Sequence, residues 1–380
     1  MHDGDSVGIT VCLAAKTLHI PQAGGALWVY LNWALGLQAL GYDVIWLEAA
    51  KPSAPVEEVS AAVASLKSRL ERYGLADSVA LCSWTTESLP REATSGCVDL
   101  DAACAADLLL NLAYDIPAQV VERFRRSALV DVDPGLTQIW ISEGGMTVAP
   151  HDVYFTIGET VGQPEALFPD CGLTWHYTPP AVFLPAWPVT PADSAAPYTT
   201  VTSWWGGWMD FRGENYGNRK RDGFFPFLDV PRRAPVPLEL AISGVAGPDL
   251  AMLSDRGWRV ADALIVVATP WDYQRYIEAS GGEFSCAKPS CVRLQNAWIS
   301  DRTLCYLASG KPAVVQHTGP SRFLPDATGL FRFRDPEEAV RYLEKATADY
   351  EAHSKRARAL AEEHFDAKKV VSSVLERAFP

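Results

Sequence analysis

The sequence predicts an α/β protein made of two successive domains, each built around a parallel sheet. Three observations support this prediction. The chain has 380 residues, which suits two domains of roughly 150–200 residues each. Short β-branched apolar runs alternate with helical patterns in both halves, as in doubly wound folds. A proline-rich stretch over residues 174–197 separates the two halves and excludes a regular element there.

The first half opens with a strand, a polar loop, a helix and a second strand. The loop ends in Gly24 and Gly25, and Gly41 ends the helix. Strands are expected at residues 7–13, 42–47, 127–132 and 153–157. Helices are expected at residues 26–40, 56–73 and 102–112. This alternation predicts a doubly wound domain over residues 1–180, followed by a hinge over residues 181–197.

A second α/β series follows the hinge and predicts a domain over residues 198–355. Its strands are expected at residues 198–202, 238–242, 263–267, 313–316 and 329–333. From Asp335, a helix N-cap, the chain reads as nearly continuous helix to its end, with apolar residues at three- and four-residue intervals. Residues 356–380 are expected to pack back across both domains.

Composition and charge argue against several classes of partner. The net charge is −13 and the charges are interspersed, so no basic face for nucleic acid is expected. No stretch reaches the roughly 18 uncharged apolar residues that a membrane span needs, and the first residues carry acids where a signal peptide carries bases. The eight cysteines show neither CxxC nor zinc spacing. Reduced thiols, a cytoplasmic location, no metal and no cofactor are therefore expected.

The segment SDRTLCYLASGKPAVVQHTG, residues 300–319, carries the most specific pattern. Ser300 is a good N-cap, Gly310 ends the helix, and a short buried strand leads into the loop His317-Thr318-Gly319. Ligands of open α/β sheets lie beyond the carboxyl ends of the strands, and helix N-termini favour anionic groups. The segment therefore predicts a site for an anionic ligand.

Two tandem Rossmann-like domains, a hinge and a helical tail together resemble the GT-B glycosyltransferases. The resemblance is most specific at residues 281–319, which are similar to the nucleotide-sugar site of the group 1 enzymes, and it extends to residues 25–48 of the acceptor domain. It implies that a nucleoside diphosphate sugar lies in the C-terminal domain and faces a cleft. The acceptor enters this cleft from the N-terminal domain.

A diphosphate leaving group gains negative charge, which a metal-free site neutralises with cations and backbone N–H groups. On the resemblance, the donor-binding residues are Gly206, Gly207, Arg219, Lys220, Glu283, Lys288, Ser300, Asp301, Arg302, His317, Thr318 and Gly319. Group 1 enzymes commonly carry two acids where this chain has Ala297 and Cys305. Asp301, one turn before Cys305, either replaces a ribose contact or only caps the helix dipole.

His19, in the loop AKTLHIPQAGG, lies where inverting GT-B enzymes carry a catalytic histidine, and Asp115 is an alternative base or a partner of the histidine. Acceptor contacts are expected from Gly24, Gly25, Glu159, Trp205 and Trp208, whereas Trp204 is expected in the core. The tryptophans favour a small, hydrophobic acceptor, such as a secondary metabolite. The donor nucleotide, the sugar, the stereochemical outcome and the oligomeric state stay open.

Three other classes of protein remain as alternatives. A nicotinamide dehydrogenase also has an acid at the end of its second strand, here Glu48, but the loop KTLHIPQAGGALW lacks GxGxxG spacing. A sugar-nucleotide 2-epimerase shares the two-domain fold and the donor site. A nucleotide-sugar-binding protein without catalysis would fit the missing pair of acids.

Overall fold

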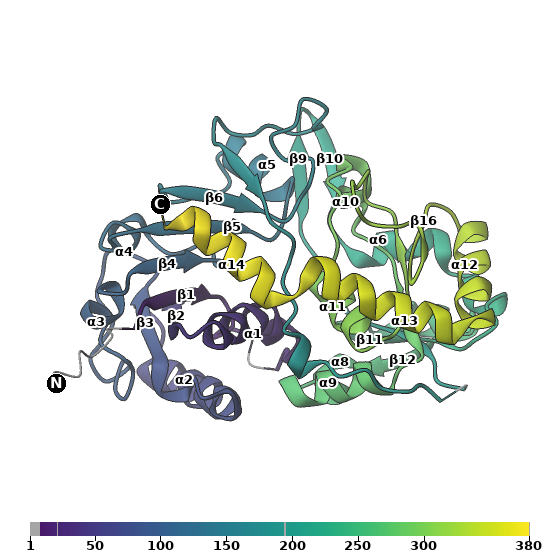
Figure 1. Ribbon diagram of the computed structural model, residues 1–380, viewed down its shortest axis with the longest axis horizontal. Helices are drawn as coiled ribbons and strands as arrows, with labels where there is room; N and C mark the ends of the chain where they lie inside the picture. Colours follow the sequence, from purple (N-terminus) through teal and green to yellow (C-terminus); the bar gives the residue numbers. More distant parts are fainter. Residues whose placement is uncertain (1–7, 21, 194, 380) are drawn as a thin grey trace, which may run out of the picture.

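The computed structural model describes residues 8–20, 22–193 and 195–379, and it contains two parallel sheets side by side (Figure 1). The first sheet has the strand order β3-β2-β1-β4-β5-β6-β7, and every neighbouring pair is parallel. Its strands are β1 (Thr10–Ala15), β2 (Asp43–Ala50), β3 (Val79–Ser83), β4 (Leu108–Asn111), β5 (Ser127–Asp131), β6 (Val153–Thr156) and β7 (Trp175–Tyr177). Its helices are α1 (Gly24–Ala39), α2 (Val56–Leu70), α3 (Leu100–Cys104), α4 (Ala118–Val121) and α5 (Leu136–Ser142).

The second sheet has the order β12-β11-β8-β13-β14-β16-β15, in which only the edge strand β15 pairs antiparallel. Its strands are β8 (Tyr198–Ser203), β11 (Leu238–Ser243), β12 (Arg259–Asp262), β13 (Gly282–Ser285), β14 (Ala313–Gln316), β15 (Ala327–Thr328) and β16 (Leu330–Phe333). A separate hairpin consists of β9 (Trp208–Phe211) and β10 (Glu214–Gly217). The helices are α6 (Lys220–Phe224), α7 (Gly247–Asp255), α8 (Ala263–Val266), α9 (Pro270–Ala279), α10 (Pro289–Leu294) and α11 (Asp301–Ala308).

The α/β class and the two-sheet architecture confirm the prediction from sequence, and two element assignments were wrong. Residues 102–112 do not form one helix, because the run of leucines forms the buried strand β4 after the short helix α3. Residues 263–267 form α8 rather than a strand, and the edge strand β12 ends just before them. Strands β3, β7, β12, β13 and β15 and the hairpin β9–β10 were not among the predicted strands. Part of the predicted first strand, at Val7, lies outside the described residues.

The C-terminal tail is helical but broken into segments. It comprises α12 (Pro336–Ala348), α13 (Tyr350–Leu360), a π-helical turn (Ala361–Phe365) and α14 (Ala367–Ala378). Short 3₁₀ turns lie elsewhere, at Glu71–Tyr73, Ala76–Ser78, Leu184–Ala186, Phe225–Phe227 and Val230–Arg232. The tail runs from the second domain back to the first, where Nε of Arg126 donates to the carbonyl of Ala378 at 2.9 Å (Figure 1).

Besides the polar contact of Glu159 with Ser321 and Arg322, the two domains touch along two separate lines. On one, α1 meets the region of α9: the amide of Gly24 donates to the carbonyl of Val267 at 3.1 Å, and Nε1 of Trp28 donates to Pro270 at 2.8 Å. On the other, Met209 and Phe211 of β9 pack into an apolar cluster with Leu136, Ile139, Val161, Phe168 and Leu294. The carboxyl ends of the central strands face the space between these two contacts. No helix in the described ranges is both long and apolar enough to cross a membrane.

Candidate functional site

A cleft of about 790 Å³ opens between the domains, at the N-termini of α1 and α11. Its walls come from the loop after β1, from the ends of β8 and β11, and from α8 and α9. The predicted residues that line it are His19, Gly24, Gly25, Ser300, Asp301 and Arg302. The cleft is therefore the place where the carboxyl ends of both sheets converge, as expected for a ligand site in an α/β protein.

Helix α11 presents its N-terminus to the cleft. Oγ of Ser300 accepts the amide of Arg302 at 3.3 Å, which confirms Ser300 as the N-cap. Asp301 follows in the first turn, and burial raises the pKa of its carboxyl from 3.8 to about 6. A carboxyl with this pKa can hold or release a proton near neutral pH.

The guanidinium of Arg302 is held from behind by buried groups. Its Nε donates to Oε1 of Glu283 at 2.8 Å, and the other two nitrogens donate to Oγ of Ser285 and to the carbonyl of Val201. Glu283 is fully buried in β13. Glu283 thus contacts Arg302 rather than a ligand, which corrects the prediction of a donor-site acid. Because the three nitrogens of Arg302 already donate within the protein, this side chain contributes positive potential to the site rather than free hydrogen-bond donors.

Lys220 and Lys288 are two further basic side chains near Arg302, although neither lines the cleft. Lys220 is buried, and its Nζ donates to the carbonyl of Cys286 at 2.7 Å. Burial, and then the charges of Arg302 and Lys288, lower the pKa of Lys220 to about 7. Lys288 caps α10 and is half-buried, and within the described ranges its side chain has no hydrogen bond or ion pair with protein. The three cations lie close together, with Glu283 as the acid bound to one of them.

The loop before β9 forms a surface of its own. Nε of Arg219 donates to Asp222 at 2.9 Å, and its guanidinium lies 4.1 Å from the ring centroid of Trp208. Trp205 and Trp208 are half-exposed and do not line the cleft, whereas Trp204 is fully buried, as predicted for a core residue. Gly206 lies against the carbonyl of Asn218, and Gly207 faces open space. Arg219 is therefore neutralised by Asp222, and the two exposed tryptophans pack with arginines.

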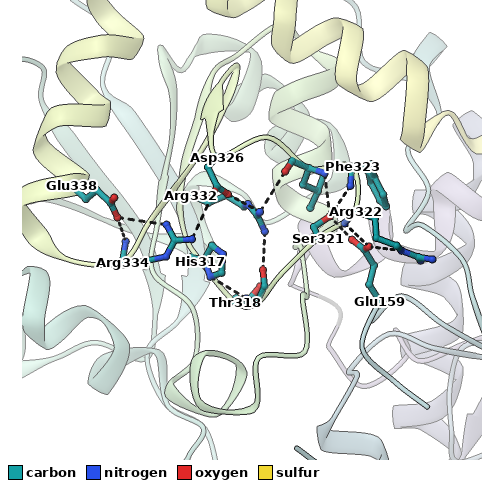
Figure 2. A network of polar contacts seen from close by, with 12 residues as sticks. Glu159, His317, Thr318, Ser321, Arg322, Phe323, Asp326, Arg332, Arg334 and Glu338 are labelled. Atoms are coloured by element: carbon teal, nitrogen blue, oxygen red, sulfur yellow. Dashed lines mark hydrogen bonds and ion pairs between the residues drawn. The ribbon is translucent and has the colours of Figure 1, made fainter. Parts of the chain in front are cut away.

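The loop after β14 is fixed by backbone contacts (Figure 2). Oγ1 of Thr318 donates to the carbonyl of Trp298 at 2.5 Å. The amide of Gly319 donates to Nδ1 of His317 at 3.2 Å. Burial, followed by the charges of Arg332 and Arg334, lowers the pKa of His317 to about 4. His317 is therefore neutral at physiological pH and brings no positive charge to the site.

Glu159 joins the two domains (Figure 2). Its Oε2 accepts from the backbone amide of Arg322 at 3.0 Å and from Nε of the same residue at 3.1 Å, and Oε1 accepts from Oγ of Ser321. The ring of Tyr177 lies 5.3 Å from the Arg322 guanidinium. The carboxylate is engaged across the interface, so the structure places Glu159 in a contact that closes the cleft and not in a free acceptor contact.

On the N-terminal side, His19 and Asp115 do not form a hydrogen bond with each other in the described structure, and each contacts a different residue. Nε2 of His19 lies 3.1 Å from the carbonyl of Ala49, and Oδ2 of Asp115 lies 2.9 Å from Nζ of Lys16. Of the two roles predicted for Asp115, that of a partner of His19 is not seen, and that of an alternative base stays a prediction. A carbonyl only accepts, so this contact places the proton of a neutral His19 on Nε2 and leaves Nδ1 free as a base.

Gly24 and Gly25 serve domain packing. A Cβ on Gly24 would lie 2.1 Å from the carbonyl oxygen of Thr269, and a Cβ on Gly25 would lie 2.6 Å from the ring of Tyr273. The two glycines line the cleft, yet the close approach that requires them is to α9 and the residue before it. Their assignment as acceptor contacts stays a prediction, since both line the cleft.

Sequence reasoning missed Asp133, which follows β5 in the stretch VDVDPG. Its backbone amide is held by the hydroxyl of Tyr114 and by Asp131, both at 3.0 Å. Nδ2 of Asn296, from the second domain, donates to the carbonyl of Pro134 at 2.7 Å. Asp133 thus lies where the domains meet, and its charge helps to raise the pKa of Asp301. The signal was available, since an acid two residues after a buried strand lies at the carboxyl edge of the sheet.

In the described ranges, no three His, Cys, Asp or Glu side chains are grouped so that they could hold a metal ion. The cationic groups around α11 form an arrangement that fits an anion.

The comparisons with known proteins concern the fold. No model of a protein family matches the chain, and no curated protein matches it. An alpha-glucosyltransferase (AGT) solved in complex with UDP matches with a TM-score of 0.61 and 12% identity, over 98% of this chain and 100% of that one. Anabaena HepE, solved in complex with UDP and glucose, matches with a TM-score of 0.59 and 10% identity, over 97% and 99%.

A sucrose-phosphate synthase from Thermosynechococcus elongatus matches with a TM-score of 0.53 and 12% identity, over 97% of this chain and 98% of that one. A further alpha-glucosyltransferase structure, solved with UDP and a 13-mer DNA, matches with a TM-score of 0.60 and 11% identity, over 98% and 100%. At these identities the likeness establishes the fold alone. The chain has the GT-B fold over nearly its whole length.

Proposed function

We propose that this protein is a glycosyltransferase that takes a sugar from a nucleoside diphosphate sugar and transfers it to a hydroxyl group bound by the N-terminal domain. The single observation that carries the proposal is the group of three basic side chains, Lys220, Lys288 and Arg302, that lie close together near the N-terminus of α11, where Arg302 lines the interdomain cleft. UDP is the favoured nucleotide, because two of the proteins with this fold are described with UDP bound.

The cations supply what the leaving group requires. As the glycosidic bond breaks, negative charge develops on the diphosphate, and groups fixed in advance stabilise it better than mobile ones. Lys220 and Arg302 are fixed by buried carbonyls and by Glu283. Lys288 has the side chain with free hydrogen-bonding capacity in the described structure, so it is the group that we assign to direct contact with the diphosphate.

His19 is the group that we assign to the acceptor hydroxyl. It lines the cleft opposite α11, and the contact of its Nε2 with Ala49 leaves Nδ1 able to accept the hydroxyl proton as the new bond forms. This arrangement fits a direct displacement with inversion.

The proposed acceptor is small and hydrophobic. The cleft is lined by Ile20 and Val29 from the N-terminal domain and by Leu264 and Val267 from the second domain, whose side chains offer apolar surface. A protein of the same fold is solved with DNA, so the fold itself is compatible with a nucleic-acid acceptor. The net charge of −13 and the apolar walls favour the small molecule here.

The test measures binding of UDP, GDP, TDP and NADH to the purified protein by calorimetry, together with turnover of the matching sugar nucleotides. We expect a uridine nucleotide to bind, and Lys288→Ala to weaken it about tenfold or more, because one charge-assisted contact is worth roughly 1.5–3 kcal/mol. Lys368→Ala, an exposed lysine of α14, is the matched control and should leave affinity unchanged.

Two results would contradict the proposal. If no nucleoside diphosphate binds, or if only NADH binds, the cations do not form a donor site. Binding without transfer to any acceptor, and without epimerisation of the donor, would instead identify a nucleotide-sugar-binding protein.

A further inference from the structure

A group of basic and aromatic side chains lies at the carboxyl edge of the first sheet, next to the cleft. Lys16 follows β1, Lys51 follows β2 and Trp84 follows β3. Nζ of Lys51 lies 5.1 Å and Nζ of Lys16 lies 5.8 Å from the ring centroid of Trp84, and the ring of His19 lies 4.7 Å from it. One of these residues follows each of the three adjacent parallel strands β1, β2 and β3, so the three side chains lie together at the carboxyl edge of the sheet.

The structure holds these residues in position. The backbone amide of Trp84 donates to the carbonyl of Ala50 at 3.0 Å, which extends the β2–β3 pairing up to the indole. The buried carboxylate of Glu48 accepts the amides of Thr17 and Leu18 at about 3 Å and so fixes the loop that starts at Lys16. The attraction between an ammonium group and an indole face then favours convergence of the two lysines on Trp84.

The charges at this edge are not balanced. Lys16 pairs with Asp115, whereas Lys51 has no carboxylate within ion-pair distance among the residues described. The group therefore keeps a net positive charge in a protein whose total is −13. Two converging ammonium groups on a chain that is otherwise acidic form a local site for an anion.

His19 connects this site to the cleft, because it both lines the cleft and packs on Trp84. We infer that the acceptor carries an anionic group, a phosphate or a carboxylate, which Lys16 and Lys51 bind beside Trp84 while the hydroxyl to be glycosylated lies at His19. The acceptor role of this edge follows from the proposed function, whereas the anion site stands on the lysines and Trp84. The acceptor is then an amphiphilic acid, with its apolar part against Ile20 and Val29.

The experiment uses phenyl phosphate, benzoate and benzyl alcohol as probes of the full-length protein, with affinities measured by calorimetry. We expect both anions to bind more tightly than the alcohol. In Lys16→Gln/Lys51→Gln the two anions should bind at least about tenfold more weakly, as for loss of charge-assisted contacts. Lys51→Gln alone should show part of this loss and does not disturb the Lys16–Asp115 pair. Lys368→Gln/Lys369→Gln, which removes the same charge from α14, should have no effect.

Equal anion affinity in the wild type and in Lys16→Gln/Lys51→Gln would overturn the inference, as would the same loss in the α14 variant. UDP binding, measured on the same samples, separates this inference from the proposed function. UDP should bind all variants equally, and its failure to bind the wild type would overturn the donor site without affecting the anion result. If the protein binds phosphatidylcholine vesicles that contain phosphatidic acid and Lys16→Gln/Lys51→Gln does not, the anion is a lipid phosphate. If the variant loses binding of phenyl phosphate but the wild type does not bind the vesicles, the anion belongs to a soluble acid.

Discussion

At the scale of single residues, Asp301 shows how the site lowers the stability of the fold. Burial at the start of α11 raises its pKa from 3.8 to about 6, so the folded state favours the protonated carboxyl. The stability that this residue contributes is fully present below pH 3.8 and is lost as the pH rises through 6. Asp301→Asn removes the titration, and we expect it to raise the free energy of unfolding at pH 8 by about 1–3 kcal/mol.

Urea unfolding of Asp301→Asn and of the wild type at pH 8 and below pH 4 checks this expectation, because the difference should shrink towards zero at the acid end. Glu376→Gln, on the exposed face of α14, serves as the control for loss of one negative charge. A variant that is no more stable than the wild type at pH 8 would mean that Asp301 is already compensated in the folded protein.

The sequence predicted where several residues of the site lie along the chain, but not which residues they contact. The N-cap Ser300, the cations Lys220 and Lys288, and His19 follow from local sequence, since each lies next to a strand end or a helix start. The partners could not be foreseen, because they are distant in the sequence. Glu283 meets Arg302 from another strand, and Glu159 meets Arg322 from another domain. Which charged side chains form ion pairs or hydrogen bonds within the protein therefore depends on the folded structure.

At the scale of elements, strands and helices with a clear period were predicted, and short buried segments were not. The run of leucines in β4 has no polar face, so its period cannot separate a buried strand from a helix. The same ambiguity placed a strand at α8, which directly follows the true edge strand β12. Both errors arise where tertiary packing decides the conformation.

The start of α1 illustrates how one element sets the geometry of the cleft. Gly24 lets α1 approach the residue before α9 so closely that a Cβ would lie 2.1 Å from the carbonyl oxygen of Thr269. Gly24→Ala must push the helix away and disturb the bond from its amide to Val267. We expect a loss of about 1–3 kcal/mol in the free energy of unfolding, as for overpacked sites, measured by urea denaturation.

Gly207→Ala is the matched control for this change, because a Cβ there meets nothing within 4 Å. Its effect should stay within about 0.5 kcal/mol. Equal effects of the two alanines would show that the contact between α1 and Thr269 is loose in solution, and that the glycine does not define the width of the cleft.

At the scale of the whole molecule, three connections hold the domains around the cleft. They are the packing of α1 near α9, the apolar cluster at β9, and the contact of Glu159 with Ser321 and Arg322. The C-terminal tail also connects the domains, because it continues from the second domain and packs on the first, where Arg126 contacts Ala378 (Figure 1). The tail was foreseen from its helical pattern, but the contacts between domains require the fold of both.

The contact made by Glu159 (Figure 2) is the one that can be weakened without touching either core. Its carboxylate is buried and accepts from a backbone amide and a hydroxyl, so Glu159→Ala leaves two donors without their partner. We expect a loss of about 1–3 kcal/mol in the free energy of unfolding and a larger radius of gyration by X-ray scattering as the domains separate. Arg322→Ala removes a side chain that is 70% exposed, and solvent screening should limit its effect to less than about 1 kcal/mol. If the arginine variant were the more damaging of the two, the ion pair, and not the buried hydrogen bonds, would hold this side of the cleft closed.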